Sequence, residues 1–529
     1  MSPGDLFYYQ PRKNQNPGRL IETDVCVLGG TSIGMIAAVQ LKKLGHTVVV
    51  AEFGLHLGGL SSGGLGATDI GNKQVIGGLS RQFYRDLGAH YGQEESWLFE
   101  PSVAEGIFNR YVREHDVPVH FEQHLSSVKK DENRIVEITM EDGTVYRAKI
   151  FIDASYEGDL LARAGVSFHV GRESNATYGE TYNGVHFGHP NHQFNRFVDP
   201  YKIAGQPDSG LCWGISAEDP GKQGDGDHRI QAYNFRVCLT DRDDNKISFP
   251  CPPNYDPERY VLLARYLATG AWDALALTVC MPNDKTDTNN CGGFSSDNIG
   301  RNYEWPNGDY ATRERIFQDH VTYNQGMYYF LANDPSVPKF IREDTARWGL
   351  PKDEFVKTGG WTHQLYIREA RRMISDYVLT EHNVVHREKV TDAVGMAAYG
   401  MDSHSCQRVV LGGRAYNEGN VEIHGFRPYP IPYRSIRPRE NECANLLVPW
   451  CVSASHIAFG SVRMEPVGMV LGQSAAFAAA LALKNSCPVQ RISVDELQKQ
   501  LRAAGQQIDD AGPGPYQAMK AIPPSIYKN

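Results

Sequence analysis

A glycine-bearing turn between two apolar stretches, within Thr23–Gly64, constrains the fold of this chain more than any other feature. The pattern predicts a strand ending at Leu28, a turn over Gly29–Gly34, a helix over Met35–Leu44 and a second strand over His46–Ala51. A helix that begins just after such a turn offers unpaired N–H groups to an anion, and an acidic residue after the second strand can accept ribose hydroxyls. These linked features predict the first βαβ unit of a dinucleotide-binding fold.

The turn has the spacing G-x-G-x-x-G, with Gly29 and Gly34 in place and Thr31 at the middle glycine. The threonine side chain narrows the approach of the backbone, but its hydroxyl can donate to a phosphate. Glu52 follows Gly34 by 18 positions, close to the offset of about 20 that dinucleotide-binding folds show. This offset favours the dinucleotide interpretation over an ordinary strand–turn–helix, and we expect these four residues and Ser32 to contact the cofactor.

A second glycine turn, Leu57–Ser62, follows the acidic residue closely. It resembles the segment that runs along the diphosphate and ribityl chain of FAD in flavoproteins with two dinucleotide-binding folds. FAD is therefore favoured over NAD as the cofactor. The further cofactor contacts that we expect are Gly58, Gly59, Leu60, Ser61, Val128, Ala154, Ser155, Val467 and Gly468.

Composition limits the classes of partner. The chain carries 53 Lys+Arg against 62 Asp+Glu, a net charge of −9 without a basic block, so a nucleic-acid partner is disfavoured. The ten cysteines are scattered, without a C-x-x-C pair or a Cys/His ligand cluster, and imply no metal site. A small-molecule substrate and an electron acceptor that the sequence does not identify are the partners that we expect.

The longest apolar run, Val467–Leu483, contains Gln473 and Ser474 and is shorter than the roughly 20 residues that a membrane span needs. We expect a core helix and no membrane span. Met1–Leu20 is polar and proline-bearing, so no signal peptide is visible. The compartment stays open between the cytoplasm and secretion with a leader that this sequence lacks.

The chain of 529 residues is longer than one core usually supports. Its middle is rich in Tyr, Trp, Asn, Asp, Pro and Gly, with one clear helix around Pro257–Thr269 and a second predicted over Leu365–Leu379. We expect the α/β class, with a split Rossmann-like FAD-binding domain and an inserted mixed α+β substrate domain. The predicted parts are 1–170 (FAD-binding, first part), 171–395 (substrate domain), 396–483 (FAD-binding, second part) and 484–529 (a tail packed on the cofactor domain).

The end of the chain is predicted to return to the cofactor. Leu446–Pro449 indicates a short strand, Ser453–Pro466 a polar loop, and Val467–Leu483 the small-residue helix. The N-terminus of that helix, aimed at the flavin pyrimidine, would stabilise the negative charge that collects there on reduction, and Arg463 would assist.

With these segments collected, the chain resembles the broad family of FAD-dependent oxidoreductases whose members often carry the unproven label "xanthan lyase". The resemblance runs nearly from end to end. It rests on GGTSIGMIAA, HLGGLSSGGLGATDIG, DASYEGDLLARAG, QAYNFRVCLT, KTDTNN, LYIREARRM, MDSH, IPYRSI and SASHIAFGSVRMEPVGMVLGQSAA. It implies a bound FAD and says little about the substrate.

The expected chemistry is removal of a hydride from a CH–OH or CH–NH group onto flavin N5, which needs a base for the heteroatom proton. His456, in the loop before the cofactor-facing helix, is the first candidate, and His404 and His363 follow. Residues expected to contact the substrate are His363, Arg368, Tyr433 and Arg434. Arg368 can equally belong to an internal ion-pair network, and Tyr433 and Arg434 can equally belong to a structural turn. A flavin monooxygenase or reductase using NAD(P)H, and a non-catalytic flavin-binding protein, are the alternatives.

Overall fold

The computed structural model describes residues 6–11 and 18–509. Its largest sheet has seven strands in the order β3-β2-β1-β6-β5-β4, with β19 also paired to β6. These strands are β1 (Leu20–Leu28), β2 (Val48–Ala51), β3 (Val119–His120), β4 (Leu125–Asp131), β5 (Arg134–Met140), β6 (Val145–Asp153) and β19 (Leu446–Leu447). The pairs among β3, β2, β1, β6 and β19 are parallel, whereas β4, β5 and β6 form an antiparallel meander. The α/β class with a Rossmann-like sheet is confirmed.

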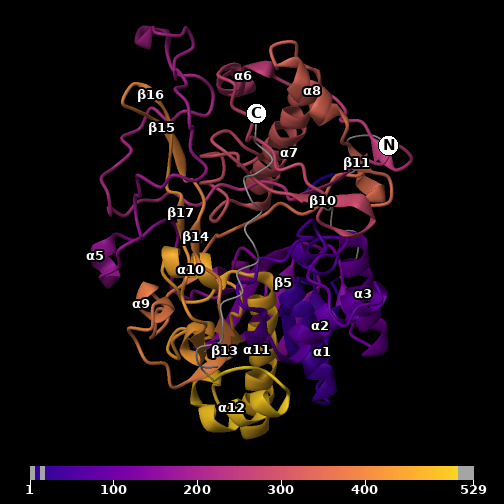
Figure 1. Ribbon diagram of the computed structural model, residues 1–529. Coiled ribbons are helices and arrows are strands. Elements are labelled where there is room, and N and C mark those ends of the chain that lie inside the picture. Colours follow the sequence, from indigo (N-terminus) through magenta and orange to yellow (C-terminus); the bar gives the residue numbers. More distant parts are fainter. Residues whose placement is uncertain (1–5, 12–17, 510–529) are drawn as a thin grey trace.

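The carboxyl half of β1 is buried throughout, from Val25 to Leu28, as expected for a parallel strand covered on both faces. α1 (Ser32–Lys43) and α11 (Glu465–Asn485) pack against each other beside this sheet, and Figure 1 shows these early and late parts of the chain together in the lower half of the view. Glycines permit the close approach: a Cβ on Gly472 would lie 2.4 Å from the carbonyl oxygen of Ile33.

The remaining elements surround these layers. The other helices are α2 (Gly78–His90), α3 (Pro101–Glu114), α4 (Asp159–Arg163), α5 (Asn175–Tyr178), α6 (Val261–Ala268), α7 (Tyr310–Asn333), α8 (Lys339–Ala346), α9 (Glu381–Val384), α10 (His456–Val462) and α12 (Val494–Ala503). The other strands are β7 (Phe168–His169), β8 (Val237–Thr240), β9 (Lys246–Ile247), β10 (Lys285–Thr288), β11 (Leu350–Pro351), β12 (Arg372–Met373), β13 (Ala393–Ala397), β14 (Met401–Ser403), β15 (Gln407–Leu411), β16 (Arg414–Glu418), β17 (Val421–Ile423) and β18 (Tyr429–Pro432). In Figure 1, α6, α7 and α8 lie in the upper half of the view.

Two expectations about local structure are wrong, and one long helix was not predicted. The prediction of a helix over Leu365–Leu379 fails, because this segment contains only β12 and its arginines are buried in ion pairs that hold it extended. The predicted loop Ser453–Pro466 contains α10, whose Ser455 side chain accepts the N–H of Ala458 as an N-cap. The 24-residue α7 was not anticipated, although Asp309 caps it by accepting the N–H of Thr312.

α11 is the one helix among the described residues that is long and apolar enough to cross a membrane by length and composition. Of its apolar window, 89% is buried inside the fold, so it serves here as a core helix. The tail, as far as residue 509, lies against the same region: Gln506 Nε2 donates to the carbonyls of Val394 and Val470 at 2.7 and 3.2 Å. The rest of the predicted tail, 510–529, lies outside the described residues, and the domain division stays a prediction.

Candidate functional site

The glycine turn Gly29–Gly34 leads directly into α1 and supplies the N-cap of this helix. Thr31 is the N-cap of α1; its Oγ1 accepts the N–H of Gly34 at 3.3 Å and donates to the carbonyl of Ala154 at 2.8 Å. Gly29 has φ of 100°, and a Cβ on Gly34 would lie 2.0 Å from the carbonyl oxygen of Gly29. Glycine is therefore required at both ends of the turn, while the middle position uses its threonine hydroxyl to tie the turn to the end of β6.

Glu52 stands directly after β2 and faces the turn. Its Oε2 accepts the N–H of Gly30 at 2.5 Å, and its Oε1 accepts the N–H of Gly54 at 2.6 Å. The residue is only 5% exposed. Burial raises the pKa of this carboxyl to about 7, although the two backbone donors act in the opposite direction.

Glu465, the first residue of α11, was missed by the sequence reasoning. Its carboxylate accepts hydrogen bonds from Ser32 Oγ at 2.6 Å, Ser61 Oγ at 2.7 Å and the hydroxyl of Tyr156 at 2.8 Å. Burial raises the pKa of this carboxyl. One side chain thus ties the starts of α1 and α11 to the second glycine turn. Its place just before Pro466, at the start of an apolar helix, was the available signal.

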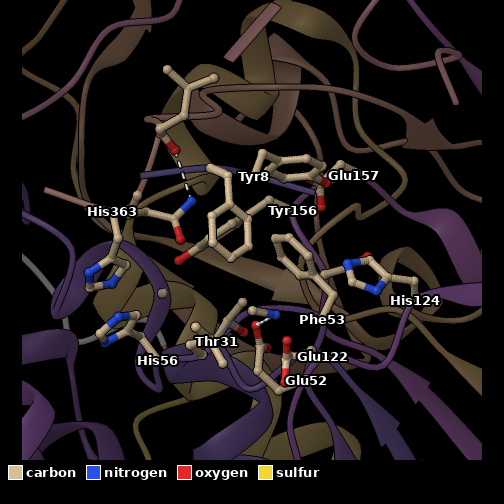
Figure 2. A pocket seen from close by; sticks show the side chains of 18 of the residues that line it. Tyr8, Thr31, Glu52, Phe53, His56, Glu122, His124, Tyr156, Glu157 and His363 are labelled. Atoms are coloured by element: carbon tan, nitrogen blue, oxygen red, sulfur yellow. Dashed lines mark hydrogen bonds between the residues drawn. The ribbon is translucent and has the colours of Figure 1, made fainter. Parts of the chain in front are cut away.

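A cavity opens over these segments. The space between its walls, part of which is open solvent, is about 1010 Å³. Figure 2 shows the side chains that line it, among them Thr31, Glu52 and Tyr156. The expected cofactor contacts on its wall are Gly29, Thr31, Glu52, Gly59 and Ser155. The others, Ser32, Gly34, Gly58, Leu60, Ser61, Val128, Ala154, Val467 and Gly468, are not part of this wall.

The residues on the wall of the cavity suit the ADP half of FAD. Its wall carries the carboxylate of Glu52, which can accept ribose hydroxyls, and Gly29 beside the start of α1, where a pyrophosphate needs close approach to the backbone. Gly59 is also on this wall, where the Tyr156 side chain leaves no room for a larger residue: a Cβ would lie 2.2 Å from its hydroxyl. These residue types fit the cofactor that the sequence predicts, and the individual cofactor contacts stay predictions.

A second group of polar side chains, the polar cluster, gathers the remaining motifs. Its members are Gln231, Asn234, Asn289, Asp297, Tyr366, Arg368, Asp402, His404 and Arg463. Arg368 Nη2 donates to Asn234 and Asn289 at 3.1 and 3.2 Å. Arg463 donates to the hydroxyl of Tyr366 at 2.9 Å. QAYNFR, KTDTNN, LYIREARRM, MDSH and SVRMEP, far apart in sequence, thus meet at one place.

His404 and Asp297 form a buried pair within the polar cluster. His404 Nδ1 lies 2.9 Å from Asp297 Oδ2, and its Nε2 lies 3.8 Å from the carboxylate of Asp402. Burial and the neighbouring Arg368 lower the pKa of His404, whereas Arg368 and His404 hold the pKa of Asp297 at about 2, against the effect of its burial. A carboxylate at Nδ1 fixes the tautomer whose Nε2 accepts a proton.

His456 occupies a different environment. It is the first residue of α10 and is 1% exposed. Its Nδ1 lies 2.8 Å from Glu369 Oε2, and its Nε2 lies 2.9 Å from Ser403 Oγ. Both ring nitrogens therefore face protein groups. The catalytic role of His456 stays a prediction.

His192 was also missed by the sequence reasoning. Its ring centroid lies 6.2 Å from that of His404, its Nε2 lies 3.2 Å from Glu422, and its side chain is 27% exposed. Its φ is 53°, a conformation that non-glycine residues adopt uncommonly and that is frequent at functional sites. It connects the polar cluster with the partly exposed loop around it.

The remaining expected substrate contacts are dispersed. His363 lines the cofactor cavity and stacks on His56 with ring centroids 3.7 Å apart. Tyr433 donates its hydroxyl to the carbonyl of Val489 at 2.7 Å, and Arg434 pairs with Asp392 at 2.9 Å. The substrate roles of these residues stay predictions. Among the residues that the structure describes, no group of three or more His, Cys, Asp or Glu side chains is arranged to hold a metal ion.

Comparison with known proteins gives a family. The sequence profile described as FAD dependent oxidoreductase matches residues 24–501. No curated protein matches the chain.

Solved structures show partial likeness. Anhydrotetracycline hydroxylase OxyS from Streptomyces rimosus is 12% identical over 29% of this chain and 38% of its own, with a TM-score of 0.24. Bacillithiol disulfide reductase Bdr from Staphylococcus aureus is 19% identical over 25% of this chain and 38% of its own, at 0.20. THI4 from Thermovibrio ammonificans is 20% identical over 29% of this chain and 66% of its own, at 0.23. The chain thus spans less than two fifths of the first two flavoproteins.

Proposed function

Because this chain belongs to the family of FAD-dependent oxidoreductases, we propose that it oxidises a CH–OH group, or alternatively a CH–NH group, of a neutral, polyhydroxylated small molecule. When bound, FAD accepts the hydride. The observation that carries the proposal is the polar cluster, in which a carboxylate-held histidine and two arginines from separate motifs meet.

His404 is the proposed proton acceptor. Its Nε2 takes the proton of the substrate hydroxyl as the carbon loses hydride, so the two electrons leave with the hydride and the proton stays on the imidazole. Asp297 holds the opposite nitrogen at 2.9 Å and stabilises the imidazolium that forms. Between the two leading candidates, this geometry favours His404, whose Nε2 lies 3.8 Å from Asp402, over His456, whose Nε2 already lies at the hydrogen-bond distance of 2.9 Å from Ser403.

The pairing of charges favours a neutral substrate. Arg368 lies 2.9 Å from Asp297, and Arg463 lies 3.3 Å from Asp402. Both guanidinium groups of the polar cluster are therefore compensated before any substrate binds. An anionic substrate would meet no uncompensated arginine here, whereas amides, carboxylates and the hydroxyl of Tyr366 suit hydroxyl groups.

The test is an anaerobic screen of the FAD-loaded protein. Neutral sugars and polyols, amines, the matching sugar acids and NAD(P)H are added separately, and bleaching of the flavin absorption is followed. Bleaching by neutral hydroxyl compounds but not by their acids supports the proposal. Bleaching by NAD(P)H alone would replace it with a monooxygenase or reductase, and bleaching by sugar acids alone would refute the charge argument.

A further inference from the structure

The N-terminal segment, residues 6–11, forms one wall of the cofactor cavity. Leu6, Phe7, Tyr8 and Gln10 all line it, although this stretch precedes the whole dinucleotide-binding motif in sequence. Tyr8 is only 8% exposed. We propose that this segment is a strap that covers the adenosine end of bound FAD and controls its release.

The strap is anchored on α7. The carboxylate oxygen Oε2 of Glu314 accepts the backbone N–H groups of both Tyr8 and Tyr9 at 2.7 Å. On the same helix, Gln318 Nε2 donates to the carbonyl of Leu6 at 2.8 Å and to Glu314 Oε1 at 2.8 Å. Hydrogen bonds to a charged group are among the stronger ones in proteins, so this anchor fixes the backbone of the strap.

The Tyr8 side chain reaches the cofactor side. Its hydroxyl donates to Glu157 Oε1 at 3.1 Å, in the turn after β6. Its ring lies 4.8 Å from that of Phe53 and 4.7 Å from that of Trp305, measured between centroids. Phe53 follows the ribose acceptor Glu52 directly, so the strap lies at the adenosine end of the cavity. Figure 2 shows the Tyr8 ring above Phe53 and Glu52.

This arrangement gives the strap two attachments, one on α7 and one on the cofactor cavity. The cavity wall that it forms must move for a ligand of the size of FAD to leave past it. FAD can then leave only after the hydrogen bonds to Glu314 break. The anchor therefore slows dissociation of FAD, although it adds no contact to the flavin ring. The inference concerns the same cofactor site as the proposed function but does not depend on the substrate.

The experiment measures FAD release from the holoprotein after dilution, by the rise in fluorescence of free FAD. Tyr8→Ala and Glu314→Ala are each expected to accelerate release on the order of 10–100-fold, since they remove the wall or the charged anchor. Arg315→Ala is the matched control, because this neighbouring residue on α7 is 65% exposed and forms a surface ion pair with the exposed Glu304. Its release rate should equal that of the unmodified protein.

A second measurement separates the strap from the site itself. ADP added to the FAD-free protein should slow amide hydrogen exchange in residues 6–11, and Glu52→Ala should accelerate FAD release through loss of the ribose acceptor. Faster release in Glu52→Ala with unchanged release in Tyr8→Ala and Glu314→Ala would overturn the strap and leave the cavity as the cofactor site. If the FAD release rate is unchanged in all three variants and ADP does not slow amide exchange in residues 6–11, both the strap and the assignment of this cavity to FAD are rejected. Flavin reduction in the substrate screen tests the proposed function independently of these results.

Discussion

Replacement of Glu52 by glutamine is expected to remove a pH-dependent loss of stability from the cofactor-free protein. Burial raises the pKa of the Glu52 carboxyl from 4.5 to about 7 in the folded protein. The folded state therefore holds this proton more tightly than the unfolded state, and stability falls as the pH rises from 4.5 to 7. At 1.36 kcal/mol per pKa unit, the ionised carboxylate costs about 3 kcal/mol above pH 7.

Because glutamine cannot ionise, the stability of the Glu52→Gln variant should not fall in this way as the pH rises. The amide also replaces one of the acceptors for Gly30 and Gly54 by a donor, which shifts the variant by an amount independent of pH. The quantity to compare is therefore the change with pH: urea unfolding between pH 4.5 and 8 should show the variant gaining about 3 kcal/mol relative to the unmodified protein.

The same substitution should weaken FAD binding, because the ribose loses an ionised acceptor. Glu114→Gln, at a side chain that is 54% exposed, removes the same formal charge without removing a buried carboxylate and serves as the control. If the difference in unfolding free energy between Glu52→Gln and the unmodified protein does not vary across this pH range, the carboxylate is not destabilised by burial and the reasoning fails.

Three further predictions concern the proposed base, the pH dependence of flavin reduction and a buried ion-pair network. His404→Gln should retain FAD and slow flavin reduction on the order of 10²–10⁴-fold, with His456→Gln slowing it much less; a larger effect of His456→Gln in stopped-flow measurements would restore His456 as the base. Because burial and Arg368 lower the pKa of His404, reduction should stay constant through neutral pH and fall only when the pH drops through that lowered value. The Asp159 carboxylate contacts Arg313 and Arg371 at 2.6 and 2.8 Å, so Asp159→Asn leaves both arginines buried without their charged partner. This substitution should cost about 3–5 kcal/mol of unfolding free energy. A loss below about 1 kcal/mol in urea titration would contradict this expectation.

The sequence predicted those parts of the fold whose signals are local. Apolar strands, a glycine turn and an acid at a set distance are read from neighbouring residues, so the first βαβ unit and the position of Glu52 were correct. The sequence did not predict α7, because its buried side chains include the polar residues Arg313, His320 and Asn324, which interrupt the apolar stripe typical of a helix. The carboxylate partner of Arg313, Asp159, lies on another element and is visible only in three dimensions. His320 and Asn324 instead bond to carbonyl oxygens of α7 itself.

The same cause explains the error at Leu365–Leu379. The spacing of its residues indicates a helix, but Arg368, Arg371 and Arg372 pair with carboxylates on three separate segments of the chain, which an extended backbone can reach. The sequence singled out His404 and Arg463 as chemistry-bearing. It could not reveal that Asp297, more than a hundred positions away from His404, holds its imidazole.

The order in which the ribosome delivers the chain has a consequence for how the cofactor site is made. Glu465 bonds to Ser32 across 433 positions, and β19 joins the sheet only after nearly all of the chain has emerged. The nucleotide-binding half that is synthesised first therefore waits without α11, its packing partner, and exposes the apolar face of α1 during translation. We expect fragments that end before residue 446 to aggregate or engage chaperones, and incorporation of FAD to be a late, post-translational step.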